Sequence, residues 1–272
     1  GNTDGIDNDE FLITLLKTRS DSFNFKNSRR SIELAREKTA EIAFTYNRTF
    51  NNSRKYFGMS LSSAFDYDTE NTDITSQSLF QDNTALGNPF LQRTRNYQNS
   101  NVSNFKMDLA QPLGKKGVLE TGYKGILRYT DADFVSENFL NGEYIKNPMA
   151  SNRFSFLEQI HAAYLQYRGY VGHADSAAWK YDVGLRAEEV FNDGRVINSN
   201  LTIKRNYLNL FPTANIAYYL KRSSFIKLSF SRRINRPDLE KLNPFTDITD
   251  SLNPHSGNPY LKPELVNSFE AG

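Results

Sequence analysis

The sequence predicts an all-β protein, an antiparallel up-and-down (meander) sheet, and three observations favour this fold class. Apolar and polar residues alternate along several long stretches, which is the period of a strand with one apolar and one polar face. The 272 residues include 20 Phe and 15 Tyr but a single Trp, and aromatic residues are enriched in strands. Short turns and long polar connections follow these stretches alternately along the chain.

Residues 1–38 form the least regular part, and we expect an N-terminal extended segment of uncertain structure there. Periodicity alone does not separate a strand from a short helix over residues 11–16. The acidic residues at the start offer oxygen ligands for Ca²⁺, but their spacing differs from that of an EF-hand loop. We therefore interpret them as a solvated terminus: Asp4, Asp7, Asp9 and Glu10.

Residues 39–272 are predicted to form the sheet domain, with about eight strands and the start of a ninth. Polar loops are expected over 69–100 and over about 25 residues that end near Ser155. The second hairpin turns at Leu113–Gly117, and a tight turn at Lys221–Ser224 joins the last pair. The strands fall into four hairpins, at roughly 39–50 with 57–67, 105–112 with 118–129, 158–171 with 178–190, and 207–220 with 224–234.

The order of turns and loops indicates a membrane-spanning sheet. Consecutive antiparallel strands reverse direction, so all the short turns fall at one end and all the long loops at the other. That asymmetry is typical of a transmembrane β-barrel, and strands of about 11–14 residues suffice to cross a bilayer at a tilt. The mean hydropathy of −0.62 is neutral, because only alternate residues of a barrel strand face lipid. The expected domain is therefore part of a transmembrane β-barrel.

Composition and motifs exclude several function classes. The absence of cysteine removes disulfides and thiol chemistry, and a net charge of +2 is too small to imply nucleic acid. The three histidines are far apart, and Glu188 and Glu189 point to opposite faces of a strand. No nucleophile motif or phosphate-binding loop occurs. We therefore predict no catalytic residue, no metal, no cofactor and no enzymatic activity.

One proline-rich stretch carries a resemblance to a known family. The strings SRRINRP (231–237), LNPF (242–245) and GNPYLKPE (257–264), followed by NSFEAG (267–272), resemble a signature of the outer-membrane β-barrel family related to TonB-dependent receptors. Three upstream strings also match in the expected order: LGKKGVLETGYKG (113–125), IHAAYLQY (160–167) and YDVGLRAE (181–188). The resemblance covers roughly residues 39–272.

The resemblance assigns a structural role to the residues of this motif. They are Arg232, Arg233, Asn235, Arg236, Pro237, Asn243, Pro244, Gly257, Asn258, Pro259, Lys262, Pro263 and Glu264. The arginines among them either anchor the loop, by bonding carbonyls and carboxylates where the strand leaves the wall, or bind an anionic ligand or a lipopolysaccharide phosphate. The sequence names no ligand-binding residue.

The resemblance also implies a function and partners. It implies a barrel of about 22 strands around a plug domain of the same full-length chain, in the bacterial cell outer membrane and in contact with its lipid. The long loops would capture an unknown solute, and a TonB-type energy-coupling complex would act through an N-terminal part. That part and a signal peptide are missing here, so we expect an excised barrel piece. The alternatives are a passive porin or surface-adhesive barrel, and a soluble β-sandwich or small ligand-binding barrel.

Alternation assigns two further sets of side chains. One set would face the lumen, where it lines a solute path, braces a plug or forms cross-strand charge pairs: Lys106, Asp108, Glu120, Lys124, Arg128, Lys180, Asp182, Arg186, Glu188, Lys227 and Arg233. The other set is aromatic, and it forms interfacial girdles in a membrane barrel or packs in the core of a soluble sheet: Tyr67, Tyr129, Tyr164, Trp179, Tyr181 and Tyr218.

Overall fold

The protein is built on one antiparallel meander sheet of ten long strands, with a short strand, β6, paired outside this path and a separate two-stranded sheet formed by β11 and β12. The computed structural model describes residues 2–17, 23–51, 54–172, 179–199, 201–221, 224–247 and 254–272. Part of the connection at 51–54, part of the predicted turn at 221–224, and His173, one of the three histidines, lie outside these residues. The long strands are β1 (Asn2–Lys17), β2 (Phe23–Thr49), β3 (Tyr56–Leu79), β4 (Phe90–Leu113), β5 (Gly117–Leu140), β7 (Asn152–Val171), β8 (Trp179–Val196), β9 (Leu201–Lys221), β10 (Ser224–Asn235) and β13 (Glu264–Ala271).

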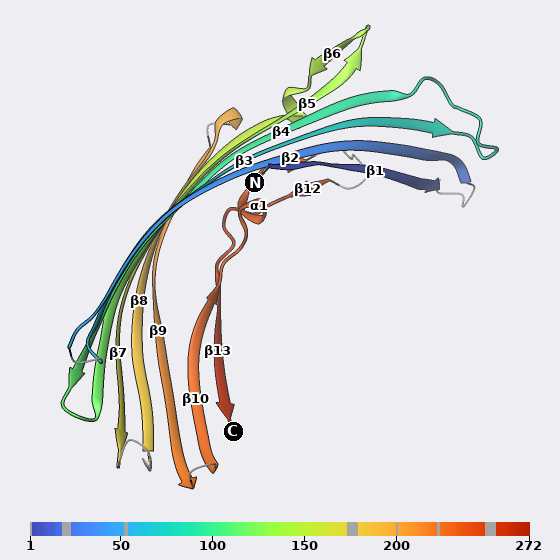
Figure 1. Ribbon diagram of the computed structural model, residues 1–272. Coiled ribbons are helices and arrows are strands. Elements are labelled where there is room, and N and C mark those ends of the chain that lie inside the picture. The colour runs from blue at the N-terminus through green and yellow to red at the C-terminus, as the bar shows by residue number, and fades with distance from the viewer. Residues whose placement is uncertain are drawn as a thin grey trace.

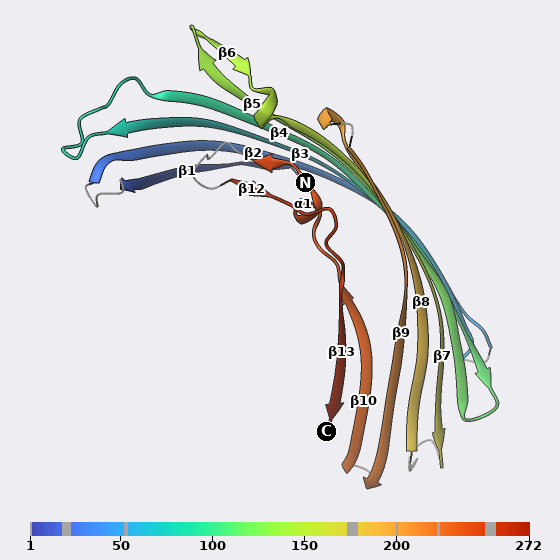
Figure 2. The ribbon, with the colours of Figure 1, turned by 180° about the vertical axis from the view of Figure 1, so that it is seen from behind.

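The sheet bends into an open arch with a hollow on one side (Figures 1 and 2). The segment between β10 and β13 runs back into this hollow, as both views show. We call residues 236–263 the motif loop, and the side of the sheet that it approaches the concave face. The short elements are β6 (Glu143–Lys146), η1 (Pro148–Ala150), η2 (Ile197–Ser199), α1 (Leu239–Leu242), β11 (Thr246–Asp247) and β12 (His255–Ser256). Among the described residues, no helix has the length and apolar character needed to cross a membrane.

The strands of the predicted sheet domain occur in the expected order. Residues 39–272 hold β2 to β5, β7 to β10 and β13, the last of which begins at Glu264. At the N-terminus, β1 pairs along its length with the first part of β2, so the extended stretch predicted there is a strand of the same sheet. Tight turns end several hairpins, and Gly114 between β4 and β5 has a φ of 65°, which glycine adopts without strain.

Two predicted loops are wrong, because the strands continue far into them. Residues 69–79 belong to β3 and 90–100 to β4, so the connection is confined to 80–89. Similarly, β5 extends to Leu140, and a tight turn joins it to β6. Asn141 and Gly142 in this turn both have positive φ, the conformation that a type I′ hairpin turn requires.

The two faces of the sheet differ sharply in chemistry. Register places directly opposite residues on the same side, and the row Phe44, Leu61 and Phe105 is apolar across β2, β3 and β4. Such side chains are exposed on the convex face, for example Ile42 at 72% and Leu228 at 58%. The buried apolar side chains of β7 and β8, such as Ile160 and Val190, lie instead on the concave face.

Candidate functional site

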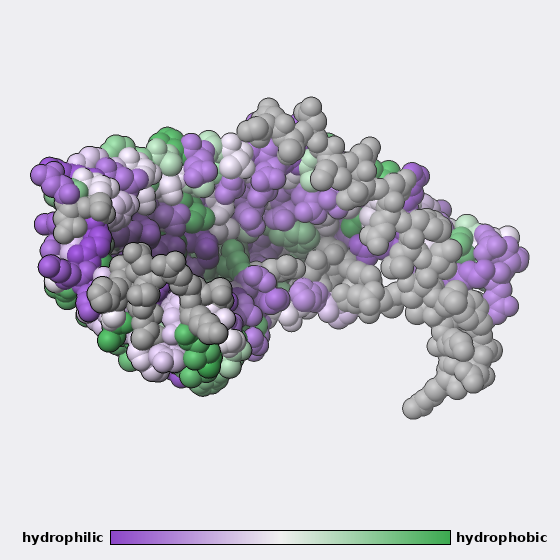
Figure 3. Space-filling view, turned by 60° about the horizontal axis from the view of Figure 1, so that its bottom comes forward, coloured by the Kyte–Doolittle hydropathy of each residue, from purple (hydrophilic) through white to green (hydrophobic). Residues whose placement is uncertain are grey.

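The charged residues predicted to face a lumen lie together on the concave face. Register runs from Lys106 to Lys124 across β4 and β5, and from Asp108 through Gly122 to the β7–β8 pair Tyr164 and Arg186. Figure 3 looks into the hollow of the molecule, whose wall is largely hydrophilic with smaller apolar patches.

Most of these charges are paired across or along the strands. Arg168 contacts two carboxylates, because its guanidinium lies 2.8 Å from Glu120 and 3.7 Å from Asp182. Gln166 also donates to Asp182, at 2.6 Å. Lys106 lies 2.7 Å from Asp108 on its own strand. The concave face is therefore a braced polar wall in which each carboxylate named here has a partner.

Two glutamates are buried in this wall. Glu158 and Glu188 are each only 5% exposed. Glu158 accepts a hydrogen bond of 2.7 Å from Arg128, while Glu188 lies between Arg186, at 3.6 Å, and Arg236. Burial of Arg236 lowers the pKa of its guanidinium, and the charge of Glu158 opposes that shift. Arg236 nevertheless stays charged at neutral pH.

The prediction that Tyr164 belongs to the aromatic girdle is wrong. Tyr164 shares the concave face with Asp108, to which its hydroxyl donates at 2.6 Å, and its ring packs over Gly122. The other members, including Trp179 and Tyr218, whose rings lie 4.6 Å apart, share the face of the exposed apolar residues. Tyr164 differs from the rest because it lies one residue out of step with Leu165 on the same strand.

The motif loop begins and ends with polar contacts between β10 and β13. Asn235 faces Glu264 across the ladder, and its side-chain amide donates to that carboxylate at 3.4 Å. Arg232 donates to Asn267 Oδ1 at 2.8 Å. Arg236, at the start of the motif loop, instead pairs with Glu188 of β8. The two strands are thus joined at the point where the chain leaves the sheet.

The interior of the motif loop is held by its asparagines. The carbonyl of Asn243 accepts from the backbone N–H of Gly257, and Asn258 donates its own backbone N–H to the carbonyl of Lys241. The side chain of Asn258 also caps the backbone N–H of Tyr260. These backbone and side-chain bonds replace the ladder that proline residues interrupt. Pro237, Pro244, Lys262 and Pro263 lie in the connecting segments.

Besides the ion pair of Arg236 with Glu188, an apolar contact and a polar contact help to seat the motif loop on the concave face. Leu239 and Leu242 of α1 pack against Phe154, Phe156 and Val196, and these three side chains are all buried.

The polar contact comes from β9. Arg205 donates to the backbone carbonyls of Pro259 and Leu261, and Pro259 is buried. Sequence reasoning missed Arg205, Glu158 and Arg168 as members of this wall. Their alternation with Tyr167 on β7 and with Leu208 on β9 was the available signal.

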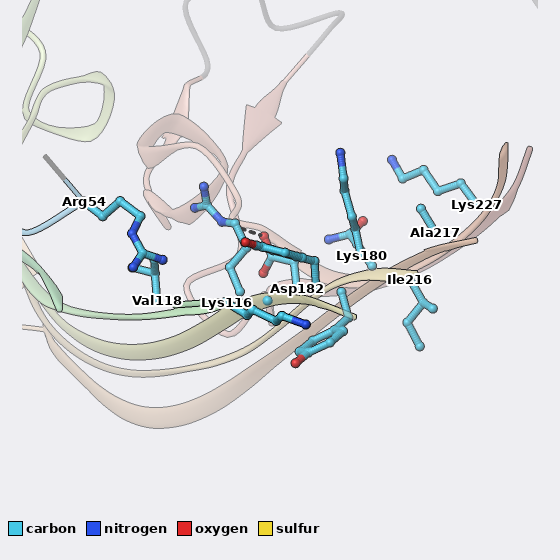
Figure 4. A pocket seen from close by; sticks show the side chains of 13 residues that line it. Arg54, Lys116, Val118, Lys180, Asp182, Ile216, Ala217 and Lys227 are labelled. Carbon is cyan, nitrogen blue, oxygen red and sulfur yellow. Dashed lines mark ion pairs between the residues drawn. The ribbon is translucent and has the colours of Figure 1, made fainter. Parts of the chain in front are cut away.

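A cavity of about 350 Å³ lies on the concave face at the short-turn end (Figure 4). Lys116, Lys180 and Lys227 line it, and Figure 4 shows Lys180 and Lys227 projecting from the same side of the sheet. None of these three lysines pairs with a carboxylate of the described chain. Above the Tyr219 ring, the ammonium group of Lys180 lies 4.5 Å from the centroid. We call this space the lysine cavity.

A turn-to-turn contact braces the same end of the sheet. Arg54, in the β2–β3 connection, donates to the carbonyls of Gly114 and Lys115 at 2.9 Å. No candidate metal site occurs among the described residues, since no three or more His, Cys, Asp or Glu side chains come together there. The side chains of the acidic start in β1 lie outside that part of the chain.

The comparison with protein families decides what kind of sheet this is. The model of the outer membrane protein beta-barrel family matches residues 48–272, most of the chain. The chain belongs to this outer-membrane β-barrel family. A comparison with curated proteins gives no match.

Several solved structures are similar to this outer-membrane barrel chain. The ferric citrate transporter FecA in its unliganded form is 11% identical, with a TM-score of 0.45, over 96% of this chain and 45% of that one. The siderophore receptor PiuA from Acinetobacter baumannii is 10% identical, with a TM-score of 0.40, over 100% and 54%. The ferric yersiniabactin uptake receptor FyuA from Yersinia pestis is 10% identical, with a TM-score of 0.35, over 96% and 45%. The chain spans about half the length of these proteins.

Family membership indicates what the convex and concave faces of the sheet contact. An outer-membrane barrel turns its apolar surface to lipid and its polar surface to the lumen, so the exposed apolar residues of the convex face contact the bilayer. The soluble β-sandwich and the small ligand-binding barrel are therefore wrong as alternatives. Proteins of this barrel family are typically not enzymes.

Proposed function

We propose that this chain forms part of the barrel wall of a transporter similar to the TonB-dependent receptors, which takes up a solute across the outer membrane. The observation that carries the proposal is the concave face, a charged wall into which the motif loop folds. A barrel that served only as an anchor would not need a seated loop inside its lumen. A solute path requires such polar groups along its walls, and catalysis plays no part in this function.

The partners of this wall are a plug domain of the same full-length protein and, through an N-terminal part, a TonB-type energy-coupling complex. The lysine cavity supports the first of these, because its three lysines lack carboxylate partners among the described residues. An acidic surface of a plug would supply the missing charges. Lipid does not reach this cavity, since it lies on the concave face.

Uptake and its energy dependence test the proposed function. Bacteria that make the full-length protein would be given radiolabelled citrate, phosphate, glucose and putrescine, in strains with and without a working TonB complex. We expect the protein to increase uptake of at least one of these solutes, and only in the strain with the complex. Equal uptake in both strains would indicate a passive pore instead, and uptake that never depends on the protein would overturn a transport role.

A further inference from the structure

A second cavity, of about 590 Å³, opens where the sheet divides. Strands β9 and β10 are paired from their short-turn end as far as Thr213 and Ser231, and beyond that point β9 pairs only with β8. The division leaves a space lined by both strands, by β7 and β8, and by the start of the motif loop. Its volume lies within the range of small-molecule sites. We call it the arginine cavity.

Arginine side chains from separate segments line this cavity. Arg186 belongs to β8, Arg233 to β10 and Arg236 to the motif loop. Register places Arg233 on the concave side, because it is in step with Lys227 and out of step with Leu228. Arg232 also lines the cavity, but its guanidinium is engaged by Asn267.

Positive charge exceeds negative charge around the cavity. Glu188 is the carboxylate that pairs with both Arg186 and Arg236. Arg233 makes no ion pair with any residue that the structure describes. The lining thus holds the guanidinium groups of Arg186, Arg233 and Arg236 and no carboxylate, and the Nε of Arg236 is buried without a hydrogen-bond partner. A buried donor without a partner is costly, so the site is electrostatically incomplete as it stands.

One of the guanidinium groups is also held in position. Arg186 stacks on Phe211, with 4.6 Å between the guanidinium carbon and the ring centroid. A stacked guanidinium keeps its edge available for hydrogen bonding in a fixed plane. Guanidinium groups bind carboxylate and phosphate through two parallel hydrogen bonds. The cavity therefore has the charge, the geometry and the volume to hold a small oxyanion.

We propose that the arginine cavity binds a small solute that carries carboxylate or phosphate groups. The proposal deepens the proposed function, on which it rests, by naming the chemical class of the solute. A lipid or lipopolysaccharide phosphate is a poorer occupant, because lipid contacts the convex face and register places Arg186 and Arg233 on the concave face. Organic carboxylates and phosphates share the recognition chemistry, and the experiment separates them.

The test is direct binding to the full-length protein, purified in detergent, measured by isothermal titration calorimetry. Citrate and inorganic phosphate serve as probes, and glucose as an uncharged control. We expect at least one anion to bind, and Arg233→Gln to weaken that binding about 10-fold, which corresponds to the loss of one charged hydrogen bond. Arg233 is the position of choice because no ion pair of the folded wall depends on it.

Two further variants make the result specific. Arg195→Gln removes an arginine of the convex face, where Arg195 pairs with Asp193, and it should bind as the unchanged protein does. Glu188→Gln removes the competing carboxylate and should bind the anion several-fold more tightly. The proposal is overturned if neither probe binds, if Arg233→Gln binds unchanged, or if Glu188→Gln binds more weakly.

The two proposals fail in different ways. Anion binding that depends on Arg233, in a protein that supports no uptake, would overturn the transport function and leave the anion site standing. Uptake that needs the TonB complex but is unchanged by Arg233→Gln would overturn the anion site and leave the transport function standing.

Discussion

At the scale of single residues, the concave face buries its carboxylates more deeply than the cations that pair with them. The side chain of Glu158 is 6% exposed and that of Arg128 is 44% exposed. A charge left without its partner is costly in a buried position and inexpensive in a solvated one. The two partners of this pair should therefore respond unequally to substitution.

This asymmetry gives a prediction about stability. Arg128→Met should lower the free energy of unfolding by about 3 kcal/mol, because it strands a buried carboxylate. Glu158→Gln should lower it by less than about 1 kcal/mol, because Arg128 then meets solvent. Urea unfolding of the full-length protein in phospholipid vesicles measures both. Equal losses would show that Glu158 does not need Arg128 as its partner.

At the scale of elements, alternation predicted each strand only as far as its apolar face extends. Beyond Tyr67 and Tyr129 the convex face also becomes charged, for example where Arg153 lies 2.7 Å from Asp131. Polar residues then occur on both faces of these strand ends, and a largely polar stretch without regular alternation is indistinguishable from a loop by pattern. The Asn141-Gly142 pair was a usable hairpin signal in that region.

The contacts that hold the motif loop on the concave face could not be predicted from the sequence, for a different reason. Its signature predicted a structured loop, but the residues that hold it are distant in sequence, such as Arg236 with Glu188 and Arg205 with Pro259. Alternation assigns a residue to a face and does not name its partner on another strand. The anchoring interpretation fits Arg236, and the cavity leaves Arg233 as the arginine available to a ligand.

A prediction at this scale concerns the ion pair that holds the motif loop on the concave face. Arg236→Met removes the ion pair to Glu188 while α1 keeps its apolar contacts, so the loop should leave its seat more often. Trypsin should then cut after Lys241 several-fold faster, as measured by mass spectrometry of the full-length protein in vesicles. Arg232→Met is the matched control, since Arg232 bonds Asn267 of the neighbouring strand β13 and does not pair with Glu188. Equal cleavage of the two variants would contradict this anchoring role.

At the scale of the whole molecule, one curved sheet separates the lipid at its convex face from the water at its concave face. Neighbouring residues of a strand point to opposite faces, so Leu165 and Gln166 of β7 experience different surroundings although they are adjacent. Leu165 is exposed on the convex face opposite Leu185. Gln166 lies on the concave face and donates to Asp182 at 2.6 Å. The same substitution at these two positions therefore isolates the effect of the face.

Leu165→Lys should lower the free energy of unfolding in vesicles by about 2–4 kcal/mol, because it places an ammonium group in the hydrocarbon region. Gln166→Lys should change it by less than about 1 kcal/mol, because the new ammonium group meets water and the carboxylate of Asp182. Urea unfolding of the two variants of the full-length protein gives the comparison. In detergent micelles, where an ammonium group reaches water more easily, the difference should shrink. A larger loss at Gln166 than at Leu165 would reverse the assignment of faces, and with it the lumen position of both cavities.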